Sequence, residues 1–203
     1  IYQKDLKQIV VFNIVISLGV MVCGTATLNT FGVKGALFYA VNDILLKAAL
    51  FIIVGLIIYV SGVKYIQKCG LINKYPLLGW TYFIVVLSLA GVPPFSGFYG
   101  KALIIKGLVA NNNTFIAILV ALSGLVVFYS LIKIFLNVFY DNINKSLILK
   151  PLPKGVQIPL IAIVAIALII GVSSNLLDGF FDKGIQMVLN PQHYIDLVLK
   201  KGA

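Results

Sequence analysis

Apolar runs of about twenty residues recur along this chain, and they restrict its fold more than any other feature. Such a run has the length of an α-helix that crosses the hydrocarbon core of a bilayer. Of the 203 residues, 61% are hydrophobic and only 11% are charged, whereas about a quarter of a soluble domain is charged. Barrel strands alternate in polarity over about ten residues, so these continuous runs predict helices. We therefore expect an all-α integral membrane protein.

The runs predict about six transmembrane helices, at residues 9–28, 36–60, 76–92, 95–111, 114–140 and 158–172. Between the third and fourth lies "LSLAGVPPFSGFYGK", where Pro93, Pro94 and Gly97 interrupt the helical pattern. A break at membrane depth is tolerated where it is buried in protein or lines a wet cavity, and broken helices often form ion sites. An ordinary tight turn between two helices is the alternative.

The chain divides into a transmembrane bundle, residues 1–175, and an interfacial tail, residues 176–203. Residues 176–189 of the tail have the pattern of an amphipathic helix lying at the membrane interface. The first residue is Ile1, and the opening "IYQKDLKQ" has the composition of a loop between helices. We therefore expect the C-terminal part of a longer protein.

The lysines give a first expectation of topology. If all six helices cross the membrane completely, the lysines of the N-terminus, of the loop before Pro76 and of the C-terminus lie on one side. Lys34, Lys145, Lys150 and Lys154 then lie on the other side. The first set is larger, which favours the cytoplasm for that side.

The remaining composition excludes several classes of function. The net charge of +10 comes from lysines scattered among short loops, and no nucleic-acid-binding motif accompanies them. Cys23, Cys69 and the single His193 lack the spacing of a metal site or a disulfide framework. No catalytic triad or phosphate-binding loop occurs either. We expect no metal, no cofactor and no classical enzyme.

Asp43 and Lys47 stand inside the second apolar run, "YAVNDILLKAALFIIVGLIIYV". A spacing of four residues puts both side chains on one face of a helix. A single charge at this depth costs at least about 2.5–3.5 kcal/mol, and ionisable residues in membrane helices usually mark ion or proton pathways. We interpret the pair as a proton-exchanging site; a structural ion pair is the alternative.

Lys101 follows the Gly- and Pro-rich break by a few residues and has similarly apolar surroundings. A lysine in such an interior can hold or release a proton near neutral pH, whereas an arginine stays charged. A lysine at a helix end that reaches the lipid headgroups is the alternative. Lys106 and Lys133 lie closer to the ends of their runs, where a headgroup contact is the simpler interpretation. Polar groups that could hold a chain of water molecules near these lysines include Asn13, Ser17, Tyr39, Asn42, Ser88 and Ser130.

The segments "ALFYAVNDILLKAALFIIVG" and "LAGVPPFSGFYGK", with the opening "QKDLKQIVVF", carry a resemblance that covers nearly the whole chain. The sequence resembles the antiporter-like membrane subunits shared by multisubunit Na⁺/H⁺ (Mrp-type) antiporters and respiratory complex I. The segment "VNDILLK" and the tail "NPQHYIDLVL" are most similar to the D subunits of the Mrp type. The chain would then comprise helices nine to fourteen of fourteen.

The resemblance implies proton translocation along a relay of buried lysines. Lys47 matches the tenth-helix lysine of the family, and Lys101 matches the twelfth-helix lysine beside a helix break. Many relatives carry Ser and His where this chain has "VVFNIVISLG", so Asn13 and Ser17 would act there as water ligands.

The expected function is that of a proton-translocating subunit in a monovalent cation/proton antiporter, with Na⁺ as the cation. Its partners would be the other antiporter subunits and the lipid of the bacterial cell membrane. One alternative is a proton-pumping membrane subunit of a complex I-like oxidoreductase or membrane hydrogenase. Another is a structural scaffold with inert ion pairs.

Overall fold

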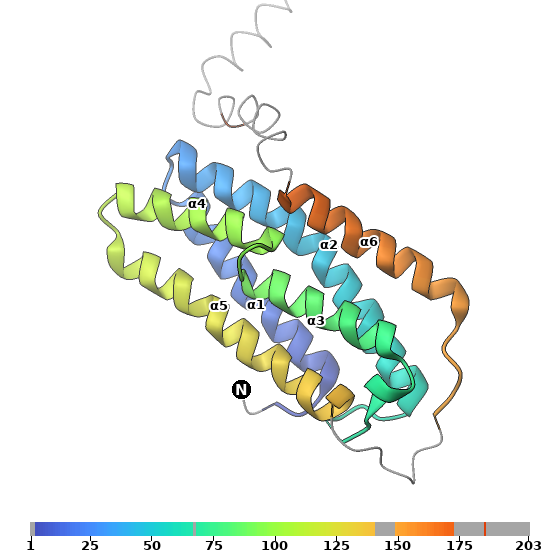
Figure 1. The fold of residues 1–203 in the computed structure, drawn as a ribbon. Helices are drawn as coiled ribbons and strands as arrows, with labels where there is room; N and C mark the ends of the chain where they lie inside the picture. Colours follow the sequence, from blue (N-terminus) through green and yellow to red (C-terminus); the bar gives the residue numbers. More distant parts are fainter. Residues whose placement is uncertain (1–2, 67, 141–148, 173–184, 186–203) are drawn as a thin grey trace, which may run out of the picture.

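The computed structural model describes residues 3–66, 68–140, 149–172 and 185, and within these ranges the chain is helical with short connections (Figure 1). In chain order, the α-helices are α1 Leu6–Thr25, α2 Thr30–Ser61, α3 Pro76–Ala90, α4 Ser96–Ala110, α5 Thr114–Ile134 and α6 Lys154–Val172. A short 3₁₀ turn, η1 Leu71–Asn73, precedes α3, and a π-helical turn, η2 Phe135–Tyr140, extends α5. The all-α class predicted from the continuous apolar runs is confirmed for this part of the chain. The predicted tail falls outside the described residues, apart from residue 185, as do Lys145 and His193.

Local signals in the sequence explain where α1 and α2 begin and where α2 ends. The Asp5 carboxylate accepts a hydrogen bond from the backbone N–H of Lys7 at 2.9 Å, and the Asn29 side chain accepts one from Gly32 at 2.8 Å. Each satisfies a backbone donor that an N-terminal turn leaves unpaired. Gly62 ends α2 with a φ of 70°, a left-handed conformation that suits glycine.

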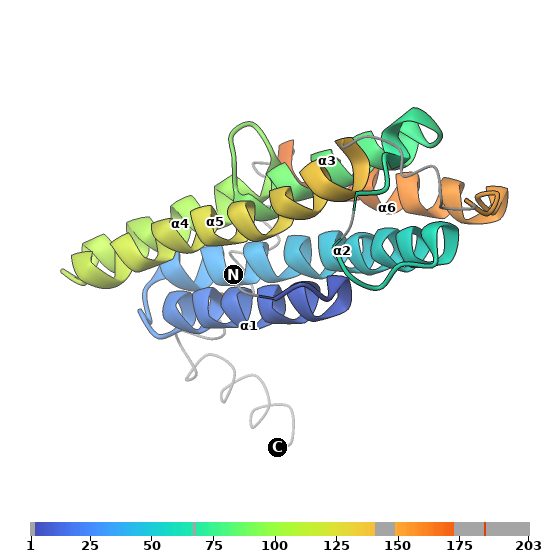
Figure 2. The same cartoon turned by 90° about the horizontal axis from the view of Figure 1, so that it is seen from below.

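Within the described ranges, three helices are long and apolar enough to cross a membrane: α1, α2, and α5 together with η2. By contrast, α3 and α4 have 15 residues each, and such a helix rises only about 22 Å. The hydrocarbon core is about 30 Å thick. Figures 1 and 2 show α4 continuing in the direction of α3 beyond a short connecting loop. Where the sequence predicted two separate spans, the structure therefore has two short helices in series.

Helix α2 lies at the centre of the bundle and contacts α1, α3, α4 and α6. Its closest approach is to α4, where glycines face each other: Gly32 and Gly35 on α2, Gly100 and Gly107 on α4. A Cβ on Gly35 would stand 2.7 Å from the backbone N of Ile104, and one on Gly107 would stand 2.6 Å from the backbone N of Gly32. Small residues allow membrane helices to pack backbone against backbone in this way.

The apolar interior consists of two clusters with a polar layer between them. The larger cluster gathers buried residues of α2, α3, α5 and α6 with the first turns of α1. The smaller surrounds α4 and includes Val20, Ala36 and Ile104. On α1, α2 and α5 the two clusters occupy different stretches of the same helix, and the residues between those stretches lie near the middle of each helix. Most of the buried polar side chains of the bundle occupy this middle level, whereas Thr27, Ser61 and Thr81 lie near helix ends.

Lysines gather at one end of the bundle. There the backbone N–H of Leu6 binds the carbonyl of Lys64, Lys74 Nζ donates to the carbonyl of Leu149, and Lys150 N–H donates to the carbonyl of Val60. The prediction that Lys150 lies on the opposite side from the loop before Pro76 is therefore wrong. That prediction assumed that α3 and α4 each cross the membrane completely.

Substitution of Gly100 by alanine tests the α2–α4 contact. The new Cβ would stand 2.8 Å from Tyr39 Cβ and 2.9 Å from Tyr39 Cα, and such overpacking typically costs about 1–3 kcal/mol. We expect Gly100→Ala to lower the thermal unfolding midpoint of the purified full-length protein. Gly55→Ala is the matched control, because nothing lies within 4 Å of a Cβ at that position of α2. Equal midpoints for the two variants would contradict the close packing.

Candidate functional site

The polar layer brings together side chains from four helices. Its buried members are Asn13 and Ser17 on α1, Asn42, Asp43 and Lys47 on α2, Ser88 on α3, and Lys101 on α4. These include the three residues that the sequence analysis singled out as the relay. The lysine amines lie in the protein interior and not at the helix ends.

Asp43 and Lys47 form an ion pair along one face of α2. The Lys47 Nζ lies 2.6 Å from Asp43 Oδ2, and the two side chains are 10% and 5% exposed. The geometry agrees with the spacing of four residues. A pair this deeply buried is costly to desolvate, and its partners depend on each other for compensation.

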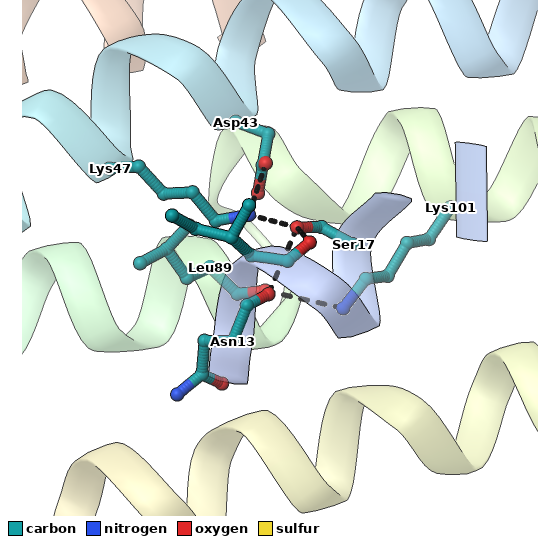
Figure 3. Close-up of polar contacts among 7 residues, drawn as sticks. Asn13, Ser17, Asp43, Lys47, Leu89 and Lys101 are labelled. Atoms are coloured by element: carbon teal, nitrogen blue, oxygen red, sulfur yellow. Dashed lines mark hydrogen bonds and ion pairs between the residues drawn. The ribbon is translucent and has the colours of Figure 1, made fainter. Parts of the chain in front are cut away.

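Ser17 supplies a second contact to the Lys47 ammonium. Lys47 Nζ donates to Ser17 Oγ, and the Ser17 hydroxyl lies within hydrogen-bonding distance of the carbonyl oxygens of Asn13, at 3.0 Å, and Ile14, at 3.1 Å. Figure 3 shows the resulting chain from Asp43 through Lys47 to Ser17. The sequence analysis expected Ser17 to act through water, whereas here it contacts the lysine directly.

Lys101 is 6% exposed, and it binds the end of α3. Its Nζ donates to the carbonyl oxygens of Ala90 at 2.9 Å and Leu89 at 3.2 Å. These carbonyls belong to the last turn of α3, where the helix dipole favours a cation. The Tyr39 ring centroid lies 5.6 Å from the same nitrogen. Tyr39 therefore presents the face of its ring to the lysine.

The interruption between α3 and α4 shapes this contact. Gly91 ends α3 with a φ of 80°, and residues 91–95, which include a cis Pro93–Pro94 peptide, lead into α4. A Cβ on Gly97 would stand 1.8 Å from the carbonyl oxygen of Ser88. The bare backbone at Gly97 thus allows the start of α4 to lie against the end of α3, which brings Lys101 within reach of the α3 carbonyls.

The sequence analysis missed the partners that are not side chains. The carbonyl groups of Leu89 and Ala90 hold Lys101, and Gly124 on α5 leaves space beside them. A Cβ at Gly124 would stand 2.7 Å from the Ala90 oxygen and 3.4 Å from Lys101 Nζ. A lone glycine in an apolar run gives only a weak signal of close packing, and its partner cannot be read from the sequence.

The two lysines face one region of the bundle. Figure 3 shows the side chains of Lys47 and Lys101 approaching from α2 and α4, with Ser17 and Leu89 between them. Three buried oxygens of this region, Asn42 Oδ1, Asp43 Oδ1 and Ser88 Oγ, have no hydrogen-bond partner among the described residues.

The secondary candidates divide into two groups. Asn13 Nδ2 donates to Ser130 Oγ on α5 at 3.1 Å. Both residues line a pocket of about 60 Å³ between α1 and α5, whose lining also includes Tyr129 and Lys133. Lys106, in contrast, is exposed, with its nitrogen 3.9 Å from the centroid of the Phe31 ring. It does not join the layer.

Among the described residues, no group of three His, Cys, Asp or Glu side chains could hold a metal ion. The structure is that of a multi-pass helical membrane protein, with an ion pair and a second amine buried at the middle of the bundle. It belongs to the class of membrane proteins that contain charged side chains within the bilayer.

Comparison with known proteins specifies that class. The family model described as the transmembrane region of NADH:quinone oxidoreductase and the Mrp antiporter matches residues 1–127. The chain belongs to this family. It is 36% identical over 204 residues to the D subunit of the Na⁺/H⁺ antiporter of Bacillus subtilis (strain 168), an alignment that covers 98% of this chain and 41% of the relative. It is 34% identical to the putative antiporter subunit mnhD2 of Staphylococcus haemolyticus, with 100% and 42% covered. The chain thus spans about two fifths of the length of these relatives.

Solved structures share the fold. A chain of the Mrp complex from Dietzia sp. DQ12-45-1b superposes with a TM-score of 0.89 at 21% identity, over 98% of this chain and 45% of that one. A chain of respiratory complex I from Thermus thermophilus gives a TM-score of 0.79 at 23% identity, over 93% and 39%. The resemblance recognised in the sequence is confirmed.

The buried ion pair makes a prediction about stability. Replacing Asp43 by leucine leaves the Lys47 ammonium without its carboxylate, a loss that typically costs about 3–5 kcal/mol for a buried pair. Replacing both partners by apolar residues of similar size is often nearly neutral. We expect Asp43→Leu to lower the unfolding midpoint of the full-length protein in detergent, and Asp43→Leu/Lys47→Met to recover most of the loss. Lys47→Met alone is measured as well. If the losses of the two single variants simply add in the double variant, the pairing is contradicted.

Proposed function

We propose that this chain is the C-terminal part of a proton-translocating subunit of a multisubunit monovalent cation/proton antiporter, and that Lys47 and Lys101 exchange protons within it. The observation that carries the proposal is the burial of both amines at the middle of the bundle, each with its own partners and with unpaired oxygens nearby. The names of the relatives in Bacillus and Staphylococcus support the antiporter assignment. They also support the bacterial cell membrane as the location.

The partners of Lys101 suit a group that changes its protonation state. A neutral amine has two N–H donors, and two carbonyl oxygens accept from this nitrogen. The Lys101 nitrogen can therefore give up a proton and keep both hydrogen bonds. Arginine cannot be deprotonated in a protein. Lysine is thus the residue type that this role requires.

Asp43 acts electrostatically on the amine of Lys47. Its Oδ2 compensates the Lys47 charge, while its Oδ1 remains without a partner among the described residues. Buried polar atoms without a protein partner are usually satisfied by ordered water. Water held by Asn42 Oδ1, Asp43 Oδ1 and Ser88 Oγ would give protons a route between the two lysines.

The pocket between α1 and α5 offers a route out of the layer. Asn13 connects the polar layer to this pocket, since its carbonyl lies within hydrogen-bonding distance of the Ser17 hydroxyl and its side chain bonds Ser130. From there the pocket extends to Lys133, in the last turn of α5. We assign Asn13 and Lys133 to proton access and leave Lys106 outside the path.

The membrane topology follows from the lysine-rich end. Lys74 precedes α3 at this end, and η2, which follows α5, contacts η1 there. The segment from α3 to α5 therefore starts and finishes at the same end, which requires an even number of crossings. We infer that α3 and α4 together make one crossing and α5 the second. The interruption at residues 91–95 then lies within the bilayer, beside Lys101.

The other subunits of the antiporter are the proposed partners, and Na⁺ is the proposed cation. Two rival readings make different predictions. In a complex I-like oxidoreductase, the full-length protein would co-purify with flavin and iron–sulfur subunits. As an inert scaffold, a variant with alanine at both Lys47 and Lys101 would keep its transport activity while the bundle loses stability.

Transport by the full-length subunit in its complex tests the proposal. We expect Lys101→Ala to reduce Na⁺-dependent proton exchange in everted membrane vesicles to the level of vesicles without the complex, because the relay loses its second amine. The change in a pH-sensitive fluorescent dye on addition of Na⁺ measures this exchange. Lys106→Ala is the matched control and should transport normally, because Lys106 lies on the same helix but is exposed. Near-normal exchange by a fully assembled Lys101→Ala complex would refute the relay.

A further inference from the structure

A groove opens at the lysine-rich end of the bundle, between the start of α3 and the start of α6. Its volume is about 650 Å³, within the range of small-molecule binding sites. The lining consists of Lys74, Tyr75, Leu149, Pro151, Leu152, Gln157 and Ile158. These residues are distant from the buried polar layer and serve no step of the proposed proton path.

Hydrogen bonds fix the polar side of the groove. The Tyr75 hydroxyl donates to the carbonyl of Lys150 at 2.7 Å, and Lys74 Nζ donates to the carbonyl of Leu149 at 3.3 Å. An ammonium has three donors, so Lys74 can bind an anion without releasing this carbonyl. Lys150 lies between two lining residues, and its nitrogen is 5.7 Å from the centroid of the Tyr59 ring. Lys74 thus lines the groove directly, whereas the Lys150 ammonium lies over the Tyr59 ring of α2, next to the lining backbone.

The apolar side of the groove continues into the membrane region. A second, smaller pocket between α3 and α6 shares Leu152 and Gln157 with the groove. Its further lining includes Leu77, Leu160 and Ile161. The surface therefore passes from lysines to aliphatic side chains along the two helices, the order in which a phospholipid presents its phosphate and its acyl chains.

The charge of this end complements an anion. Among the described residues that meet there, the lysines include Lys4, Lys7, Lys64, Lys74 and Lys150. The acid among them, Asp5, binds the backbone N–H of Lys7 as the cap of α1. Basic pockets between transmembrane helices bind anionic lipid headgroups.

We propose that this groove binds the phosphate headgroup of an anionic phospholipid, with Lys74 on the phosphate, the Lys150 side chain turned from the Tyr59 ring toward it, and an acyl chain along the α3–α6 surface. Bound lipid would tie residues 149–152 to the start of α3. The site is independent of the proton relay and of the cation that the complex exchanges.

Native mass spectrometry of the purified full-length subunit in its complex tests this proposal, with phosphatidylglycerol and phosphatidylcholine as probes. A lysine near an anionic lipid contributes roughly a fivefold gain in affinity. We therefore expect Lys74→Gln/Lys150→Gln to weaken phosphatidylglycerol binding about twentyfold. Lys7→Gln/Lys64→Gln is the matched control, because it removes the same charge from the same end but away from the groove. Lys74→Arg/Lys150→Arg should keep the lipid.

Four outcomes would overturn the site. Unchanged phosphatidylglycerol binding in the groove variant would do so, as would an equal loss in the control, which indicates diffuse surface attraction. Equal binding of phosphatidylcholine would remove the preference for an anionic headgroup. An excess of inorganic phosphate should not displace the lipid, and displacement would identify a site for soluble anions.

Discussion

The cost of a charge in a low-dielectric interior governs this structure. Asp43 and Lys47 compensate each other at 2.6 Å along one face of α2, and Ser17 on α1 supplies a further oxygen. Among the described residues, Lys101 has no such carboxylate partner in direct contact, and it binds the carbonyls at the end of α3. Because a buried ammonium without partners would be strongly destabilising, the helices around these groups are held to the positions that supply the oxygens. The interruption between α3 and α4 is one result, since an uninterrupted helix would offer no free carbonyls at that level.

Close helix packing and the polar layer depend on the same choice of small residues. Glycines bring α2 and α4 together backbone to backbone, and the bare Gly97 and Gly124 leave space around the end of α3. Larger side chains would separate the helices, and Lys101 would then lose its carbonyl partners. The proposed transport chemistry therefore rests on close glycine packing as well as on the polar side chains themselves.

Sequence reasoning found the charged residues of the layer but not its full construction. The pairing of Asp43 and Lys47 was predictable because residues four apart lie on the same face of a helix. Lys101 was noticeable because it follows the Gly- and Pro-rich break by a few residues. The carbonyls of Leu89 and Ala90 were not predictable, since every residue has a carbonyl and only the fold frees particular ones. The arrangement of α3 and α4 in series was not predictable, because hydropathy records apolar length and not the direction in which a chain leaves a turn. The assumption that each crosses the membrane completely also misplaced Lys150. The roles of Asn13, Ser17 and Lys133 stay proposals.

The central claim is that water joins the two lysines inside the layer. A cryo-electron microscopy map of the full-length complex, at a resolution that shows ordered water, tests it most directly. The account predicts density for water molecules that contact Asn42 Oδ1, Asp43 Oδ1 and Ser88 Oγ and form a continuous chain from Lys47 to Lys101. A layer closed by apolar side chains, without water between the two nitrogens, would contradict it.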